Sequence, residues 1–297
     1  MYLLIGDDRD PCIEGVEAYL RARNQPVMVT STPLSDDCQF AWRLAKDQSS
    51  SRVSFKNGDG KRVNGDDWRG VVVRSFGNSA TSANWEANDL AYVQTETQSA
   101  LIAWLKSLSC PVVNPPLAEN WFRPNRTLPE QQAIFARAGL PALESIVTND
   151  LVTARKVAGR WGGKATYMPL TSPLRYQITD DSQWQELEKV MTQIPVCLVE
   201  PAPESAVRAT YVNGEMVWAE SSELDDAQRR PLIEGMRRLA RLASLELFQI
   251  ELLVKRGEAR CVSFNGFVQY GFHNEAEQER ISCHTAELLI SGKGGSK

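Results

Sequence analysis

The first thirty residues predict a strand, a helix and a second strand. Tyr2–Ile5 is an apolar run that ends at Gly6, and apolar side chains then recur at helical spacing from Ile13 to Leu20. A further run, Pro26–Thr30, has the composition of a strand. A helix between two strands buries its apolar face against the sheet that the strands form. We therefore expect the chain to open with an α/β domain.

Turn and breaker residues divide the rest of the chain into further segments. The prolines at 115 and 116 stop both helix and strand, so an N-terminal α/β domain is predicted over residues 1–116. A middle lobe is predicted over 117–194 and a C-terminal lobe over 195–297, which gives a fold class that combines α/β and α+β parts. The elements predicted after the opening unit are hairpin 52–63, strand 71–73, helix 99–108, strand 111–114, helix 129–138, strand 143–148, helix 151–160, strand 164–170, strand 195–200, hairpin 207–220, helix 231–244, hairpin 249–264 and helix 275–290.

Composition limits the kinds of protein that the chain can be. Of its 297 residues, 42% are hydrophobic and 24% are charged, which are ordinary values for a globular protein. No apolar run approaches the roughly 20 residues that span a bilayer, and the N-terminus lacks the basic start of a signal peptide. The net charge of -4 argues against a nucleic-acid binder that relies on phosphate contacts. We expect a cytoplasmic protein that binds neither membrane nor nucleic acid.

The cysteines and histidines argue against a metal or disulfide framework. The six cysteines contain no C-x-x-C pair, which predicts reduced and mostly buried thiols. With only two histidines, a tetrahedral zinc site is not expected.

The last predicted hairpin brings three oxygen-bearing side chains together. If its turn centres near Gly257, Glu251 faces Ser263, and Asn265 lies two residues further along the same side. Carboxylate and amide oxygens are hard ligands that suit Mg²⁺. The alternative is an ordinary surface hairpin whose polar side chains face water.

Arg208 is a further candidate site residue, because its position on the chain requires a partner of opposite charge. It lies among apolar residues on a predicted strand, where an unpaired cation is costly, so an anionic partner is expected. That partner is phosphate, Glu220 or Glu251.

The order of these elements resembles the ATP-grasp superfamily over nearly the whole chain, with the N-terminal domain in the place of a pre-ATP-grasp domain. More narrowly, residues 92–150 are similar to the graspetide or microviridin type of peptide ligase, with likeness also to ribosomal-protein-glutamate ligases. The motifs that carry the resemblance are Glu96 in Thr95-Glu-Thr-Gln98, Pro111-Val-Val-Asn-Pro-Pro116, Ala138-Gly-Leu-Pro141, Ile146-Val-Thr-Asn-Asp150, Val207 to Ala219, and Val262-Ser-Phe-Asn265.

The resemblance implies a ligase that uses ATP and Mg²⁺. ATP phosphorylates a substrate carboxylate, and an amine or hydroxyl then attacks the acylphosphate while the metal neutralises the phosphates. It implies a phosphate-contacting, catalytic role for Arg208 and metal positions at Glu251, Ser263 and Asn265. The expected substrate is a peptide or a small-molecule carboxylate, and a second copy of the chain or a partner enzyme is a further expected partner.

The adenine side of the implied site lies on strand 195–200. By resemblance, the backbone around Leu198 contacts the adenine edge, and Glu200 is the acid that addresses adenosine. The alternative for Glu200 is a strand-end charge before Pro201.

Three positions depart from the family pattern. Met168 stands where the family places a phosphate-binding lysine, and Leu128 stands near the place of another, for which Arg126 or Arg123 is a possible substitute. Ser263 replaces the glutamate of the metal motif. A hydrogen bond to a charged group contributes about 1.5–3 kcal/mol, so these losses together would abolish ordinary use of ATP.

Two hypotheses therefore compete, and a third remains. The first is an ATP-dependent ligase that joins a carboxylate to an amine or hydroxyl. The second is a degenerate ATP-grasp protein, a pseudoenzyme that binds a peptide or partner enzyme without turning over ATP. The third is an α/β protein outside the superfamily.

Overall fold

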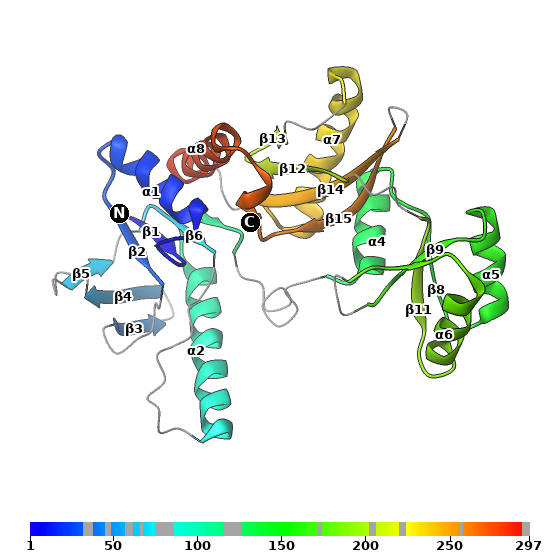
Figure 1. Ribbon diagram of the computed structural model, residues 1–297. Coiled ribbons are helices and arrows are strands. Elements are labelled where there is room, and N and C mark those ends of the chain that lie inside the picture. The colour runs from blue at the N-terminus through cyan, green and yellow to red at the C-terminus, as the bar shows by residue number, and fades with distance from the viewer. Residues whose placement is uncertain are drawn as a thin grey trace. The chain divides into compact units, whose positions relative to one another are not determined.

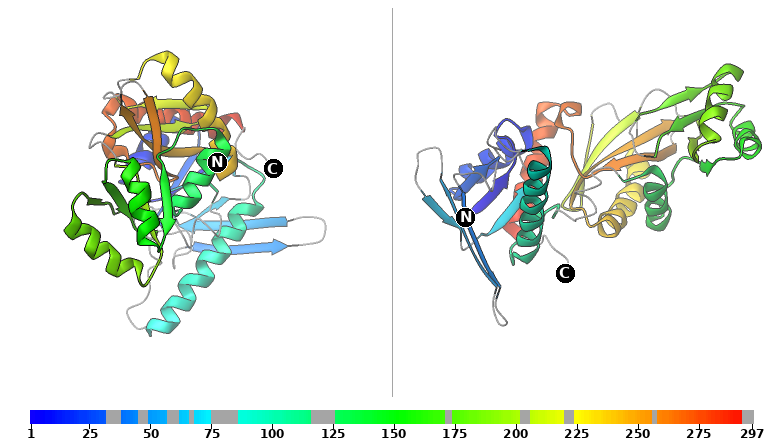
Figure 2. Two further views of the ribbon diagram at one scale, coloured as in Figure 1. Left: turned by 90° about the vertical axis from the view of Figure 1, so that its right-hand side faces the viewer. Right: turned by 90° about the horizontal axis from the view of Figure 1, so that it is seen from below.

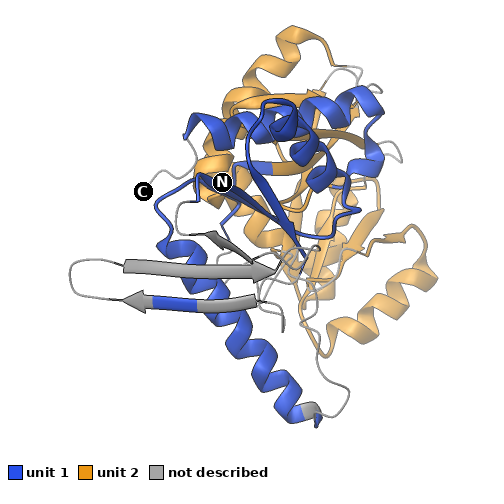
Figure 3. Ribbon diagram, turned by 90° about the vertical axis from the view of Figure 1, so that its left-hand side faces the viewer, with its two compact units in different colours: residues 1–122, 245–247, 269–297 blue, residues 123–244, 248–268 orange. Residues whose placement is uncertain are grey.

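The computed structural model consists of two compact units (Figures 1 and 3). It describes residues 1–31, 38–44, 49–56, 62–65, 68–74, 86–115, 126–170, 174–201, 206–219, 224–255 and 258–292. Unit 1 comprises Met1–Phe122, Leu245–Leu247 and Gln269–Lys297, and unit 2 comprises Arg123–Ser244 and Phe248–Val268. Pro116, at the predicted end of the first domain, lies outside the described residues. The predicted three-segment division stays a prediction.

Unit 1 is built on a parallel sheet in the order β2-β1-β6-β7. Its strands are β1 (Tyr2–Ile5), β2 (Val27–Thr30), β6 (Gly70–Val73) and β7 (Val112–Val113). Its helices are α1 (Pro11–Ala22), α2 (Ala87–Ser107) and α8 (Glu275–Ser291). The predicted β-α-β opening is confirmed, because α1 connects the parallel neighbours β1 and β2.

The two faces of this sheet carry different helices (Figures 1 and 2). Leu3, Ile5 and Val71 pack against the α2 residues Leu101 and Trp104. On the other face, a Cβ at Gly70 would lie 3.0 Å from Leu289 of α8. Helix α8 also packs closely against α1, since a Cβ at Gly15 would lie 2.3 Å from the Ser282 hydroxyl. The final helix of the chain therefore belongs to the N-terminal unit.

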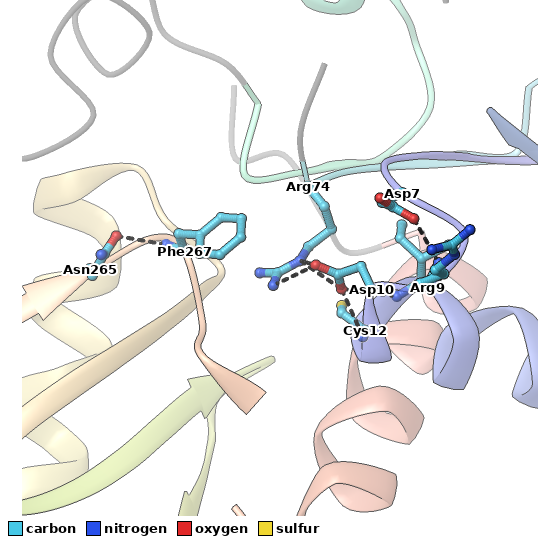
Figure 4. Close-up of polar contacts among 8 residues, drawn as sticks. Asp7, Arg9, Asp10, Cys12, Arg74, Asn265 and Phe267 are labelled. Atoms are coloured by element: carbon cyan, nitrogen blue, oxygen red, sulfur yellow. Dashed lines mark hydrogen bonds and ion pairs between the residues drawn. The ribbon is translucent and has the colours of Figure 1, made fainter. Parts of the chain in front are cut away.

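An ion pair stands at the carboxyl ends of β1 and β6 (Figure 4). Asp10 caps α1 by accepting from the backbone N–H of Cys12 at 2.8 Å. The Arg74 guanidinium donates to both Asp10 oxygens, at 3.1–3.2 Å, and the Arg74 N–H donates to the Ile5 carbonyl at 2.8 Å. The two side chains are only 4% and 15% exposed. One carboxylate thus fixes the start of α1 relative to two strands.

Asn114, in the quoted Pro-Val-Val-Asn-Pro motif, has a clear structural role. Its φ of 49° is left-handed, a conformation that asparagine tolerates better than most residues. Its side-chain oxygen accepts from the backbone N–H groups of Glu246 and Leu247, both at 3.0 Å, and its side-chain nitrogen donates to the Leu247 carbonyl. The motif therefore attaches the segment Leu245–Leu247 to unit 1.

Unit 1 also carries a small antiparallel sheet, β3-β4-β5. Its strands are β3 (Cys38–Leu44), β4 (Ser49–Lys56) and β5 (Arg62–Gly65). Phe55 pairs with Val63 and Lys56 with Arg62, which confirms the hairpin predicted over 52–63.

Unit 2 contains a small sheet in the order β10-β9-β11-β8. Its strands are β8 (Ser145–Thr148), β9 (Ala165–Met168), β10 (Tyr176–Ile178) and β11 (Val196–Val199), and helices α5 (Leu151–Arg160) and α6 (Asp181–Met191) cover one face. The core between them includes Ala158, Trp184, Leu187 and Leu198. Strand β11 lies between β8 and β9 and pairs with both. It was predicted to open the C-terminal lobe, but it pairs with strands of the predicted middle lobe.

The second sheet of unit 2 has the order β13-β12-β14-β15. Its strands are β12 (Ala206–Val212), β13 (Glu215–Trp218), β14 (Leu247–Lys255) and β15 (Glu258–Asn265), with helices α4 (Leu128–Ala138) and α7 (Asp226–Ala243). Asn213 and Gly214 both have positive φ, 51° and 85°, as the predicted type I′ hairpin requires. Helix α7 begins earlier than the predicted 231, because Asp225 and Gln228 form a capping box and Pro231 lies inside the helix.

Replacing Gly235 by alanine tests the contact between α7 and Leu140, two residues beyond the end of α4. A Cβ at Gly235 would lie 2.3 Å from a Leu140 methyl carbon, so the added methyl group should destabilise the protein by about 1–3 kcal/mol. Gly159→Ala in α5 is the matched control, since nothing lies within 4 Å of its Cβ position, and it should gain about 0.5–1 kcal/mol. Urea denaturation of both variants measures the difference. Equal stabilities would contradict the close approach.

The described cysteines are free, and three of them are buried: Cys12, Cys197 and Cys261. Burial raises the pKa of the Cys197 thiol to about 11 and that of Cys261 to about 12. Because the thiolate is the nucleophile, both should resist iodoacetamide at pH 8 in the folded protein. Cys283, which is half-buried, should be labelled before either of these two. Peptide mapping by mass spectrometry checks the order, and labelling of Cys261 before unfolding would contradict its burial.

None of the described helices combines the length and the apolar character needed to cross a membrane.

Candidate functional site

The β14–β15 ribbon places two of the three predicted metal positions face to face. Glu251 pairs with Ser263, as predicted, and Asn265 pairs with Gln249 at the end of the ribbon. The register shifts between Glu251 and Leu252, so a bulge lies beside Glu251. Gly257, at the predicted turn, lies outside the described residues.

Glu251 is surrounded by hydrogen-bond donors, two of them cationic. The Arg175 guanidinium donates to both carboxylate oxygens, with Nη1 3.3 Å from Oε1. Nη2 of Arg208 lies 3.7 Å from the same Oε1, and the Ser263 hydroxyl donates to Oε2 at 3.0 Å. The Glu251 side chain is 13% exposed, against about one third for each arginine. The carboxylate therefore accepts hydrogen bonds from Arg175 and Ser263 and forms an ion pair with Arg208.

The predicted anionic partner of Arg208 is thus identified within unit 2. Of the alternatives, Glu251 forms the ion pair, whereas Glu220 lies outside the described residues. Arg175 is the residue that the sequence did not reveal. It precedes β10 in the small sheet and lies 76 positions from Glu251, so no local spacing signals the contact.

Asn265, the third predicted metal position, is the last residue of β15. Its side-chain oxygen accepts from the Phe267 N–H at 2.8 Å, which closes a turn at the end of β15 (Figure 4). A metal at this position would compete with that turn for the amide oxygen.

The residues present do not fit a magnesium ion. Mg²⁺ is ordinarily held by one or two carboxylates together with substrate phosphates. Here Glu251 already accepts hydrogen bonds from Arg175 and Ser263 and forms an ion pair with Arg208. The described residues contain no cluster of three acidic, histidine or cysteine side chains. At about 4 Å near a protein surface, unit charges interact by about 4 kcal/mol, so a guanidinium repels a dication by roughly twice that. With one carboxylate and two guanidinium groups, the site has a net positive charge, which disfavours a dication.

One apolar cluster contains Met168 and Leu128, which the resemblance places at one lysine position of the family and near another. Met168 and Leu128 are 7% and 6% exposed, and both belong to a cluster that contains Cys197, Leu253 and Val262. The cluster joins the small sheet to the β14–β15 ribbon. Burial among such side chains does not favour a phosphate group.

Of the two proposed substitute cations, the structure describes Arg126. Arg126 donates to the Ala243 carbonyl at 3.1 Å, which ties the start of α4 to the end of α7. Arg123 lies outside the described residues.

Leu198 and Glu200 lie on and just beyond the central strand of the small sheet. Leu198 pairs with Ile146 on one side and Tyr167 on the other, and its side chain is fully buried. The Glu200 carboxylate forms an ion pair with Arg260 of β15 and accepts from the Glu144 N–H at 3.4 Å. Arg260 and Arg175 thus both form ion pairs that link the small sheet to the β14–β15 ribbon.

Comparison with solved structures identifies the fold. The macrocyclase MdnC of Microcystis aeruginosa MRC, bound with its precursor peptide MdnA, matches with a TM-score of 0.75 and 15% identity over 98% of this chain and 99% of that one. A RiPP-associated ATP-grasp ligase of Chryseobacterium gregarium, in complex with ADP and a leader and core peptide, has the same TM-score and identity over 98% and 96%. The ATP-grasp ligase PsnB, complexed with minimal precursor, Mg and ADP, matches with a TM-score of 0.71 and 21% identity over 98% and 97%.

At these identities the likeness establishes the fold and not the activity. No protein-family model and no curated protein matches the sequence. The chain has the ATP-grasp fold, and the solved structures that it resembles include RiPP-associated peptide ligases. The expected fold class is confirmed.

Proposed function

We propose that this protein binds a peptide through an ATP-grasp fold and does not turn over ATP with magnesium. The observation that carries the proposal is the state of Glu251, whose carboxylate is held by Arg175, Arg208 and Ser263. A magnesium ion would have to displace a charge-assisted, two-pronged contact and then lie beside two cations. The apolar cluster at Met168 and Leu128 adds a second obstacle, because it offers the triphosphate no cation.

The peptide part of the proposal is supported by the fold. The compared structures contain a precursor peptide in MdnC, a leader and core peptide in the Chryseobacterium ligase and a minimal precursor in PsnB, and each matches 98% of this chain. A protein with this fold whose described residues hold Glu251 in ion pairs and bury Met168 and Leu128 in an apolar cluster is suited to binding a peptide rather than activating it.

Two assays on the full chain test the proposal. Incubation with ATP and Mg²⁺, with and without a pool of random 20-residue peptides, should release no ADP above a protein-free control. Selection of the same pool on the immobilised protein should enrich specific sequences. Peptide-dependent ADP release that disappears in Glu251→Gln would overturn the first half, and a selection that enriches nothing would overturn the second.

The second candidate is an ATP-dependent peptide ligase. It is favoured by one observation, that Arg208 and Glu251 remain together on adjacent strands of one sheet, β12 and β14. In that case Mg²⁺ and ATP would separate Arg175 from Glu251 during binding. The ADP-release assay distinguishes the two candidates.

A further inference from the structure

The charge around Glu251 has the opposite sign from that of a metal site. The carboxylate contributes one negative charge, and the two guanidinium groups that contact it contribute two positive charges, because arginine stays protonated in proteins. The Ser263 hydroxyl adds a neutral donor on the same carboxylate. The group of four side chains therefore carries a net positive charge.

We propose that Arg175 takes the place of a divalent cation, and that Arg175, Arg208 and Glu251 form a metal-independent binding site for an anionic ligand group, a carboxylate or a phosphate. The proposal rests on the proposed function, since it names the ligand chemistry of that same site. Its new element is that anion binding needs no metal and depends on a residue of the small sheet.

The geometry supports binding of a second anion. Both guanidinium groups approach the same Glu251 oxygen, Oε1, at 3.3 Å for Arg175 and 3.7 Å for Arg208, so the two cations lie close together. Each arginine side chain remains about one third exposed, whereas Glu251 is mostly covered. An incoming anion therefore meets guanidinium N–H groups first. Guanidinium groups bind carboxylate and phosphate through paired hydrogen bonds, which makes two of them together a suitable receptor.

The two arginines lie at different sheets of unit 2, so a bound anion should affect the stability of the unit. Arg175 lies next to β10 in the small sheet, and Arg208 and Glu251 lie on β12 and β14 of the second sheet. An anion that bridges both arginines adds a link between the two sheets, beside the existing pair of Arg260 and Glu200. Binding should therefore stabilise unit 2 against unfolding, by mass action.

The experiment measures anion binding with and without metal. The arginine side-chain N–H signals of the full-length protein are titrated by nuclear magnetic resonance with pyrophosphate, with the blocked tripeptide acetyl-Ala-Glu-Ala-amide, and with its glutamine counterpart. Each titration is run in EDTA and again in excess MgCl₂. The glutamate peptide should bind with the same dissociation constant in both. Pyrophosphate should bind in EDTA, where no Mg²⁺ complexes it in solution, and the glutamine peptide should not bind.

Three variants locate the site. Arg175→Ala and Arg208→Ala should each raise the dissociation constant about ten- to hundredfold, the loss expected for a charged hydrogen bond. Arg155→Ala is the matched control, because Arg155 also lies in the small-sheet lobe and pairs with the exposed Asp181. It should leave binding unchanged. In Arg175→Ala combined with Ser263→Glu, the restored second carboxylate should make binding of pyrophosphate dependent on Mg²⁺.

The outcomes separate this proposal from the proposed function. Metal-independent binding of pyrophosphate, of the glutamate peptide or of both supports it, and the probe that binds identifies phosphate or carboxylate as the ligand group. Binding only in MgCl₂, an unchanged Arg175→Ala variant, or no binding of either probe would overturn it. ADP release with Mg²⁺ would end the proposed function whatever the titrations in EDTA show.

Discussion

Replacing Asp10 by alanine should lower the free energy of unfolding by about 3–5 kcal/mol, the usual cost of removing one partner from a buried ion pair. The Arg74 guanidinium is 4% exposed and donates to both Asp10 oxygens, so the variant leaves a buried cation without its carboxylate. The same change removes the side-chain cap of α1, which adds about 1 kcal/mol. Urea denaturation of the full chain, followed by tryptophan fluorescence, measures the loss.

Two further variants make the Asp10 result interpretable. Glu17→Ala removes a surface partner of Arg21 on the same helix, and its effect should stay within about 0.5 kcal/mol. Asp10→Ala combined with Arg74→Met should recover part of the lost stability, because no charge is then left buried. If Asp10→Ala were no more destabilising than Glu17→Ala, the ion pair would not fix α1 to the sheet.

Met168→Lys should destabilise the protein by about 4 kcal/mol at neutral pH, because burial disfavours the charged amine among apolar side chains. Met168 is 7% exposed and packs in the cluster with Leu128, Leu253 and Val262. Burial would lower the pKa of the introduced amine, so the unfolded state would bind more protons than the folded state, and the penalty should shrink as the pH is raised. Urea denaturation at several pH values measures this dependence.

The same variant discriminates between the two functional hypotheses. If position 168 faced a phosphate subsite open to solvent, lysine would be tolerated and would strengthen ATP binding about ten- to hundredfold. Met168→Leu, which nearly conserves volume, is the control and should cost less than about 1.5 kcal/mol. A stable Met168→Lys variant with improved ATP affinity would favour the ligase.

Much of the fold follows from local signals in the sequence. Helices α4 and α5 begin at capping residues and are followed by glycines with positive φ. The pair Asn213-Gly214 forms the turn of the β12–β13 hairpin. Helix α6 carries such a signal as well, with Asp180 as its cap and buried Trp184 and Leu187 on one face, although it was not among the predicted elements. Helix α2 extends over Ala87–Ser107 and so begins well before the predicted start at 99. The prediction missed its first turns because they are largely exposed and lack apolar periodicity.

The candidate site combines one contact that the sequence predicts with others that only the tertiary structure shows. The facing pair of Glu251 and Ser263 follows from hairpin arithmetic, since one turn fixes the register of two adjacent strands. Arg175 belongs to another sheet, and only the tertiary structure brings its guanidinium to Glu251. The sequence left three alternatives for the anionic partner of Arg208, and the described residues show an ion pair with Glu251.

The most direct test of the central claim is whether Glu251 binds a divalent cation. Mn²⁺ in place of Mg²⁺, added with a non-hydrolysable ATP analogue, reports binding through its electron paramagnetic resonance signal. Because Arg175, Arg208 and Ser263 occupy the carboxylate, the wild-type protein should take up no more Mn²⁺ than Glu251→Gln does. Stoichiometric Mn²⁺ binding by the wild type that is lost in Glu251→Gln would contradict the account.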